Sequence, residues 1–194
     1  MTVDNEVFSP AESRPPVIGR IYSLFARVLD YPGNDISGQV KELAMKVGAS
    51  NSEAAESLRK FQSELQAMPL GQVQELYTST FDMRPDRTTN LGCHLFGEDV
   101  RRNLFMAQLK VRMEARHIVM GSELPDHLSL VLQLLATEDS EDEARTLIGD
   151  CLSPAVARIL LTFEENPNPY ANALQALAIV LNQERAAAAS RGTL

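Results

Sequence analysis

The chain has 194 residues, of which 44% are hydrophobic and 23% are charged, a composition typical of one soluble globular domain. It carries 18 Lys and Arg residues against 26 Asp and Glu residues, and its net charge of −8 would repel a nucleic acid backbone and attract basic segments of a partner. The absence of tryptophan and the aromatic content of 6% also disfavour a base-stacking surface. We therefore expect no nucleic acid partner, although solubility alone explains the acidic charge equally well.

The cysteines and the N-terminus indicate the cellular compartment. Cys93 and Cys151 show neither metal-site spacing nor a disulfide framework, which favours a reducing compartment. Residues 1–6 are acidic and lack the basic and apolar regions of a secretory signal. No apolar run approaches the ~20 residues needed to span a bilayer. We expect a cytoplasmic location without membrane insertion.

Helical periodicity begins near residue 17. Residues 1–16 hold prolines and few apolar residues, so we expect a flexible N-terminal arm followed by one helical domain over residues 17–190. Residues 82–90 follow no period and are predicted to form the longest internal loop. Helices are expected over residues 17–29, 36–47, 52–68, 72–80, 99–120 and 124–136, from Glu138, from Ser153, and over 171–189. Because no segment alternates like a strand, the predicted fold is all-α, a single globular domain of about nine helices.

The segment from Gly121 to Ala136 joins a polar cluster to an apolar helical stripe. The apolar residues recur at the spacing of one helix face, which predicts burial of that face. They are Leu124, Leu128, Val131, Leu132 and Leu135. We expect Pro125 in the first turn of this helix, where a missing N–H is tolerated, and Asp126 beside the positive end of the helix dipole.

Residue types that carry catalysis or bind metals are present but follow no recognised pattern. The histidines and cysteines lack metal-ligand spacing, so we expect no metal and no cofactor. Asp126 and His127, with Glu123 nearby, could transfer a proton, but no nucleophile or oxyanion site accompanies them. At a helix start, three such residues more often form a helix cap with a surface hydrogen-bond network. We therefore assign no catalytic residue.

The long helix expected from Asp99 carries several arginines. Asp99 is a natural N-cap, and Arg102 could pair with Glu98 or Asp99. Arg112 and Arg116 fall in one sector of the helix with Arg101, which is compatible with a peptide-binding surface and equally with a solvated face.

Five short motifs, in order along the chain, resemble the nitrate reductase delta-subunit family of cytoplasmic assembly chaperones for molybdenum enzymes. They are the helix end Leu-Asp-Tyr-Pro at 29–32, Tyr-Thr-Ser-Thr-Phe-Asp at 77–82, the segment 94–102 with its histidine, Gly-Glu and arginine, Glu-Leu-Pro-Asp-His-Leu at 123–128, and the helix of residues 168–178. The resemblance implies a chaperone that binds the apo catalytic subunit of a molybdenum oxidoreductase such as a nitrate reductase. Binding to its N-terminal segment would allow the molybdopterin cofactor to be inserted before membrane docking or export.

The same resemblance implies which residues contact the partner. They are Tyr77, Asp82, His94, Glu98, Arg102, Glu123, Pro125, Asp126 and His127. The binding groove is expected near residues 82–90, 94–102 and 123–128. A homodimer is compatible with this interpretation, because an exposed apolar groove can self-associate.

Two other classes of function stay open at this point. One is a small helical hydrolase or oxygenase that would use a metal held by His94, Glu98, Asp126 and His127. The other is a structural subunit that remains in the finished enzyme complex.

Overall fold

The computed structural model describes residues 16–164 and 168–191, and within these ranges it contains helices and no β-strand. The α-helices are α1 (Pro16–Val28), α2 (Ile36–Gly48), α3 (Ser52–Gln66), α4 (Leu70–Tyr77), α5 (Leu91–Phe96), α6 (Arg101–Ala115), α7 (Leu128–Ala136), α8 (Glu141–Thr146), α9 (Ser153–Leu161) and α10 (Tyr170–Arg191). Two π-helical segments, Thr78–Asp82 and Leu147–Leu152, and one 3-10 turn, Pro85–Arg87, complete the described structure. The all-α prediction is confirmed. The predicted N-terminal arm lies outside the described residues, except for Pro16.

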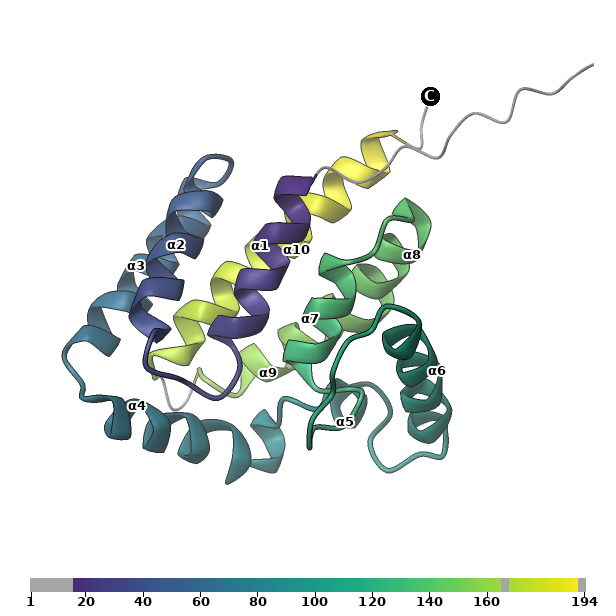
Figure 1. Cartoon of the computed structure of the whole chain (residues 1–194), viewed down its shortest axis with the longest axis horizontal. Helices are drawn as coiled ribbons and strands as arrows, with labels where there is room; N and C mark the ends of the chain where they lie inside the picture. Colours follow the sequence, from purple (N-terminus) through teal and green to yellow (C-terminus); the bar gives the residue numbers. More distant parts are fainter. Residues whose placement is uncertain (1–15, 165–167, 192–194) are drawn as a thin grey trace, which may run out of the picture.

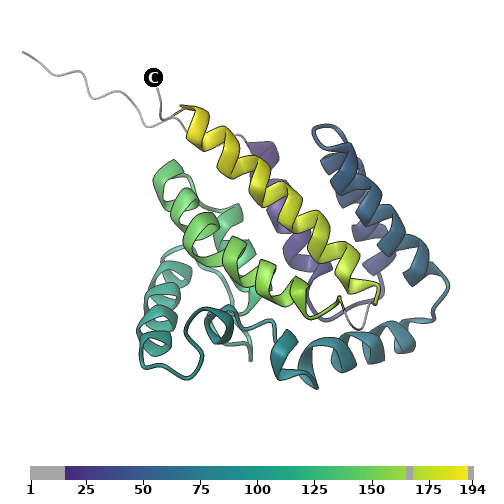
Figure 2. The same ribbon diagram turned by 180° about the vertical axis from the view of Figure 1, so that it is seen from behind.

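Helix α1 lies at the centre of the molecule. It packs against α2 on one side and α7 on the other, and α10 runs along α3 and α9 (Figure 1). Seen from behind, α10 runs across the molecule in front of α1 (Figure 2). Helices α1 and α7 approach closely at Gly19, where a Cβ atom would lie 2.6 Å from the carbonyl oxygen of Ala136. No helix in the described part of the chain is long and apolar enough to cross a bilayer.

Counted as continuous helical runs, the described structure has nine helices, but not the nine that were predicted. Helix α8, the π-helical segment Leu147–Leu152 and α9 form one run, because the residues at both junctions keep helical dihedral angles. Ser153 therefore does not begin a separate helix as predicted, and its side-chain hydroxyl is buried without a hydrogen-bond partner in the described structure. Pro154 cannot donate a hydrogen bond to the preceding turn, and a π-helical turn before it accommodates that loss. The short helix α5 was not predicted.

Helix α7 begins later than its sequence pattern suggested. Its first residue is Leu128, not Leu124, because residues 126–128 pair with residues 89–91 in an extended conformation. Leu124 is 46% exposed, whereas both faces of α7 are buried. The predicted burial is therefore confirmed for Leu128, Val131, Leu132 and Leu135 and wrong for Leu124, and the opposite face of α7 is buried as well. Pro125 and Asp126 lie in the turn before it and not in its first turn.

Helix α6 is shorter than expected and ends at Ala115. Two residues later, His117 has a left-handed backbone conformation with φ 55°. Two arginines at the C-terminal end of α6, one of them the C-cap, do not form a free basic stripe. Arg112 and Arg116 both donate to the buried carboxylate of Glu138, at distances of 2.9 and 2.7 Å. These arginines tie α6 to the chain after α7. Arg101 pairs with Asp99, whose side chain also accepts the Arg101 backbone N–H as expected for a cap.

Candidate functional site

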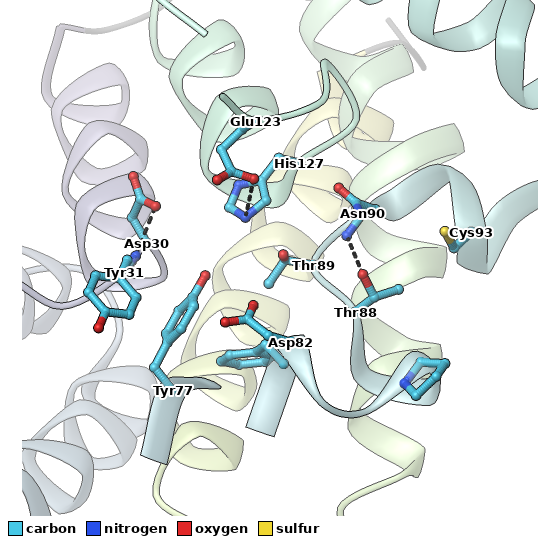
Figure 3. Close-up of a pocket in the computed structure, with 12 residues that line it drawn as sticks. Asp30, Tyr31, Tyr77, Asp82, Thr88, Thr89, Asn90, Cys93, Glu123 and His127 are labelled. Atoms are coloured by element: carbon cyan, nitrogen blue, oxygen red, sulfur yellow. Dashed lines mark hydrogen bonds and ion pairs between the residues drawn. The ribbon is translucent and has the colours of Figure 1, made fainter. Parts of the chain in front are cut away.

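An open pocket of about 540 Å³ lies where four separate parts of the chain meet. Its walls come from the end of α1, from α4 with its π-helical extension, from the segment between that extension and α5, and from the turn before α7 (Figure 3). The lining residues are Asp30, Tyr31, Tyr77, Phe81, Asp82, Pro85, Thr88, Thr89, Asn90, Cys93, Glu123 and His127.

The π-helical extension of α4 places two of these residues on the pocket side. In an α-helix, residues five apart point about 140° away from each other. Here Met83 N–H donates to the carbonyl oxygen of Thr78, five residues earlier, so that this turn is wider. As a result Tyr77 and Asp82 face the same space (Figure 3). The predicted helix end at residue 80 falls inside this extension.

An aromatic cluster supports the floor of the pocket. Tyr77 packs against Phe81 and Tyr170, with ring centroids 5.0 and 5.7 Å apart, and the ring of Tyr31 meets Tyr77 edge-on at 5.6 Å. Tyr77 is only 3% exposed, but its hydroxyl group points into the pocket (Figure 3). No residue in the described part of the chain forms a hydrogen bond with this hydroxyl group. The cluster therefore holds a polar group at the floor of an otherwise aromatic surface.

The pocket is strongly acidic. Asp30, Asp82 and Glu123 line it, whereas none of its described lining residues is Lys or Arg. Burial raises the pKa of the Tyr77 phenol well above its ordinary value, and the negative charges of Asp30 and Asp82 raise this pKa further. Burial, supported by these carboxylates, therefore favours the protonated phenol, and the carboxylates give the pocket a negative potential.

His127 joins the pocket to α7. It is the N-cap of α7, and its Nδ1 accepts the backbone N–H of Ser129 at 3.3 Å. Because a backbone N–H can only donate, the proton of the neutral ring is on Nε2. That nitrogen lies 3.8 Å from a carboxylate oxygen of Glu123. Of the three residues for which a helix cap was considered, His127 makes the cap; it is 4% exposed and lines the pocket.

Backbone hydrogen bonds fix the two pocket segments to each other. Leu91 N–H donates to the carbonyl oxygen of Asp126, and Leu128 N–H donates to that of Thr89, both at 2.8 Å. This isolated pairing continues into no sheet within the described residues. It sets the distance between the wall that carries Thr88–Asn90 and the wall that carries Glu123 and His127.

Asp126 lies behind the pocket wall and is completely buried. Its Oδ2 accepts the backbone N–H of Gly92 at 3.1 Å and the Nε–H of Arg102 at 2.9 Å. The predicted pairing of Arg102 with Glu98 or Asp99 is therefore wrong. A carboxylate that is out of water requires a partner of opposite charge, and of Glu98, Asp99 and Asp126 only Asp126 is buried.

The other predicted partner-binding residues lie around the pocket. His94 is half-buried, and its Nε2 is 2.7 Å from the carbonyl oxygen of Thr88. This contact links α5 to the segment that forms one wall of the pocket. The backbone carbonyl of His94 accepts from Arg158. Glu98 is exposed beyond the left-handed Gly97, and Pro125 is half-buried in the turn before α7. Of the nine residues, the pocket is lined by Tyr77, Asp82, Glu123 and His127.

The four residues of the metal-enzyme alternative do not converge. His94 faces Thr88, Glu98 lies on the surface, and Asp126 is enclosed by Gly92 and Arg102. Across the described residues, no three His, Cys, Asp or Glu side chains are grouped as metal ligands.

Eight of the twelve lining residues are absent from the predicted set, and Asp30 and Tyr31 lie farthest in sequence from the segments expected to form the groove. They follow α1, about 50 residues before the next lining residue. Their motif was recognised at 29–32, but only as a helix end. Its polar Asp-Tyr pair, placed directly after a buried helix, is the feature that could have identified them.

A family model for the nitrate reductase delta subunit matches residues 46–176, about two thirds of the chain. The chain belongs to this family. Its members are chaperones of molybdenum enzymes. Four of the pocket residues, Tyr77, Asp82, Glu123 and His127, lie inside the matched region. Asp30 and Tyr31 precede it. A comparison with individually curated proteins gives no match.

Proposed function

We propose that this delta-subunit family member is a cytoplasmic maturation chaperone without catalytic activity of its own. It binds the apo catalytic subunit of a molybdenum oxidoreductase, such as a nitrate reductase, through that subunit's N-terminal segment. The bound subunit stays open while the molybdopterin cofactor is inserted, and membrane docking or export follows release.

One observation carries the location of the binding site. The open pocket collects residues from three motifs that are far apart in sequence, at 29–32, 77–82 and 123–128. Its aromatic floor and polar rim are typical of a surface that binds a peptide segment, where apolar anchors supply affinity and polar groups supply orientation. Glu123 and Tyr31 are about half exposed, at 51% and 54%, and are therefore free to contact a partner.

Calorimetric titration tests this proposal directly. The full-length chaperone is titrated with peptides that contain the first ~30 residues of each molybdenum-enzyme catalytic subunit of the same organism. We expect saturable binding at micromolar or lower concentration, about 8 kcal/mol or more, and at least about tenfold weaker binding by Tyr31→Ala, which removes an exposed aromatic anchor. Glu53→Gln, on the exposed start of α3, serves as a control. Absence of binding to every peptide and to the unloaded full subunit would exclude this function.

A cellular measurement tests the maturation step. In a strain that lacks the chaperone, the partner oxidoreductase should accumulate without molybdopterin, and the wild-type gene should restore its cofactor content. If the purified oxidoreductase is fully loaded without the chaperone but lacks a stoichiometric subunit, the retained structural subunit becomes the better interpretation.

A further inference from the structure

We propose that the outer face of helix α6 binds the same face of a second copy of this chain, with the two α6 helices antiparallel. None of the residues that line the acidic pocket belongs to α6, so that this interface goes beyond the proposed function. Three features carry it: an uncovered apolar stripe, a local balance of charge and a residue pattern that is complementary to itself.

Exposed apolar side chains gather on the outer face of α6. Val100, Leu104 and Val111 are 75%, 63% and 66% exposed, and Ala107 is exposed between them. At about 100° per residue, these four positions lie within about 60° of one another and form one stripe, the α6 stripe. Leu109, on the opposite side of the helix, is buried. The core therefore uses one face of α6, and the described residues leave the other face bare.

The surroundings of the α6 stripe leave room for a partner. Helix α6 lies at the edge of the molecule in both views (Figures 1 and 2). A shallow hollow of about 490 Å³ lies beside Ala107 and Val111. Gln108 and Arg112 line this hollow and also a smaller one of about 200 Å³, which lies between α5, α6 and residues 146–151. An uncovered apolar stripe next to open hollows is typical of a protein interaction site.

The charges around α6 cancel. Its five basic residues, counted to the C-cap, all form ion pairs, and their partners are five acidic residues. The pairs are Arg101 with Asp99, Arg102 with Asp126, Lys110 with Glu114, Arg112 with Glu138 and Glu143, and Arg116 with Glu138.

This local balance favours a second copy over a charged partner. The whole chain has a net charge of −8, so that two copies repel each other when they approach through their acidic surfaces. The neutral surroundings of α6 lower that repulsion. They also provide no electrostatic attraction for a strongly basic or acidic partner. Interfaces between identical chains are the more apolar class of protein interface, which suits the α6 stripe.

The α6 stripe is complementary to itself in an antiparallel pair. With a twofold axis between residues 107 and 108, Leu104 of one copy lies level with Val111 of the other. The small Ala107 then lies at the crossing, where two helix backbones approach closely. Gln108 lies beside the crossing, and its amide group can hydrogen-bond with the same group of the second copy. An antiparallel pair also opposes the dipoles of the two helices.

The size of α6 sets the strength of this interface. The helix has 15 residues and is therefore about 22 Å long. One pair of helices of this length buries less than about 1,200 Å², the low end for specific interfaces. We expect a dissociation constant of about 10–100 µM. The protein should therefore be a monomer in dilute solution and a dimer at high concentration.

Sedimentation equilibrium of the full-length protein, between about 1 and 300 µM, tests this interface. We expect the wild-type protein to dimerise and Leu104→Glu to stay monomeric, because a carboxylate in an apolar interface loses its water. Leu161→Glu is the matched control, since Leu161 is also 63% exposed but lies on α9. It should dimerise as the wild type does. A monomeric wild type, a dimer that survives Leu104→Glu, or equal dissociation of both variants would overturn the α6 interface.

The sign of the charge and the salt dependence test its apolar basis. Leu104→Lys reduces the net negative charge of the chain, but it should dissociate the dimer as Leu104→Glu does. Salt screens the repulsion between the copies and should strengthen the wild-type dimer. A stronger dimer with Leu104→Lys, or dissociation of the wild type by salt, would mean that ionic attraction holds the copies together and would overturn the role of the stripe.

Disulfide cross-linking tests the antiparallel arrangement. Leu104→Cys and Val111→Cys proteins are mixed at high concentration and oxidised with glutathione disulfide, and mass spectrometry locates the cross-links. We expect most cross-links to join position 104 of one copy to position 111 of the other. Links that mostly join identical positions would mean parallel helices and would overturn this arrangement. Peptide binding at the pocket does not require α6, so that failure of the α6 interface leaves the proposed function intact.

Discussion

Two acidic residues of one short motif have opposite environments. Glu123 is 51% exposed and faces the pocket with no Lys or Arg beside it in the described structure, whereas Asp126 is 0% exposed and bonded to Arg102 and Gly92. They are only three positions apart in the sequence. Glu123 can exchange its bound water for a partner at little cost in free energy. Asp126 cannot lose its contacts unless the structure around it unfolds. We infer that Glu123 is the group of this motif that contacts the partner, and that the bond between Asp126 and Arg102 holds Glu123 in position.

The largest expected effect is on the buried pair. Arg102→Ala leaves the Asp126 carboxylate buried without its cation and should lower the free energy of unfolding by about 3 kcal/mol. Adding Asp126→Asn to this variant should recover part of the loss, which denaturant unfolding can measure as a double-mutant cycle. If the two effects add without coupling, the two side chains do not depend on each other, and the contrast with Glu123 disappears.

Gly92→Ala tests the same junction from the side of α5. An added Cβ would lie 2.6 Å from Oδ2 of Asp126 and 2.9 Å from Cγ of Arg102, so that the pair would have to move. We expect a loss of about 2 kcal/mol in unfolding free energy. Gly71→Ala in α4 is the control, because nothing lies within 4 Å of its added Cβ. The control should be neutral or stabilising by up to about 1 kcal/mol. Equal stability of the two variants would contradict the described packing.

His127 lies between the two environments and separates their contributions. His127→Ala removes the N-cap of α7 and should cost about 1 kcal/mol or more, whereas His127→Asn keeps a capping acceptor and should cost less. Both variants lose the Nε2 group that faces Glu123. Thermal unfolding should therefore distinguish them, while peptide binding should weaken in both. Normal binding by His127→Asn would show that this residue acts only as a cap.

The smallest expected effect is that of Tyr77→Phe at neutral pH. Because the Tyr77 hydroxyl group has no hydrogen-bond partner in the described structure, its removal should change stability by less than about 0.5 kcal/mol. A loss above about 1 kcal/mol would reveal a hydrogen-bond partner for this hydroxyl group.

Alkaline pH should expose the role of this phenol. Burial raises the pKa of Tyr77 and of Tyr170 above the ordinary tyrosine value of about 10. The unfolded chain therefore loses these protons first, so that stability is unchanged below about pH 10 and falls above it. Tyr77→Phe should make that fall less steep, as followed by circular dichroism against pH. An unchanged slope would mean that Tyr77 ionises normally in the folded protein.

Local patterns predicted the elements whose boundaries depend on nearby residues. Three predicted helix ends lie within a few residues of the observed ends. They are the ends of α2 and α3, predicted from periodicity, and the end of α1, predicted from the Asp-Tyr-Pro sequence that follows Leu29. The start of α7 was misplaced because Leu124 fits the helical period but lies where the backbone pairs with a distant segment. Backbone pairing between distant segments does not change the hydrophobic periodicity of the sequence, so periodicity cannot predict it.

By itself, the sequence determined the all-α class, the family and the stretches that carry the site, because periodicity and short motifs are local properties of the chain. Only the tertiary structure decided which acidic groups are free. Arg102 reaches Asp126 across 24 residues instead of its neighbours, and Asp30 joins Asp82 and Glu123 from the far end of α1. Burial and charge pairing depend on which segments meet in space, and spacing along the chain does not encode those meetings.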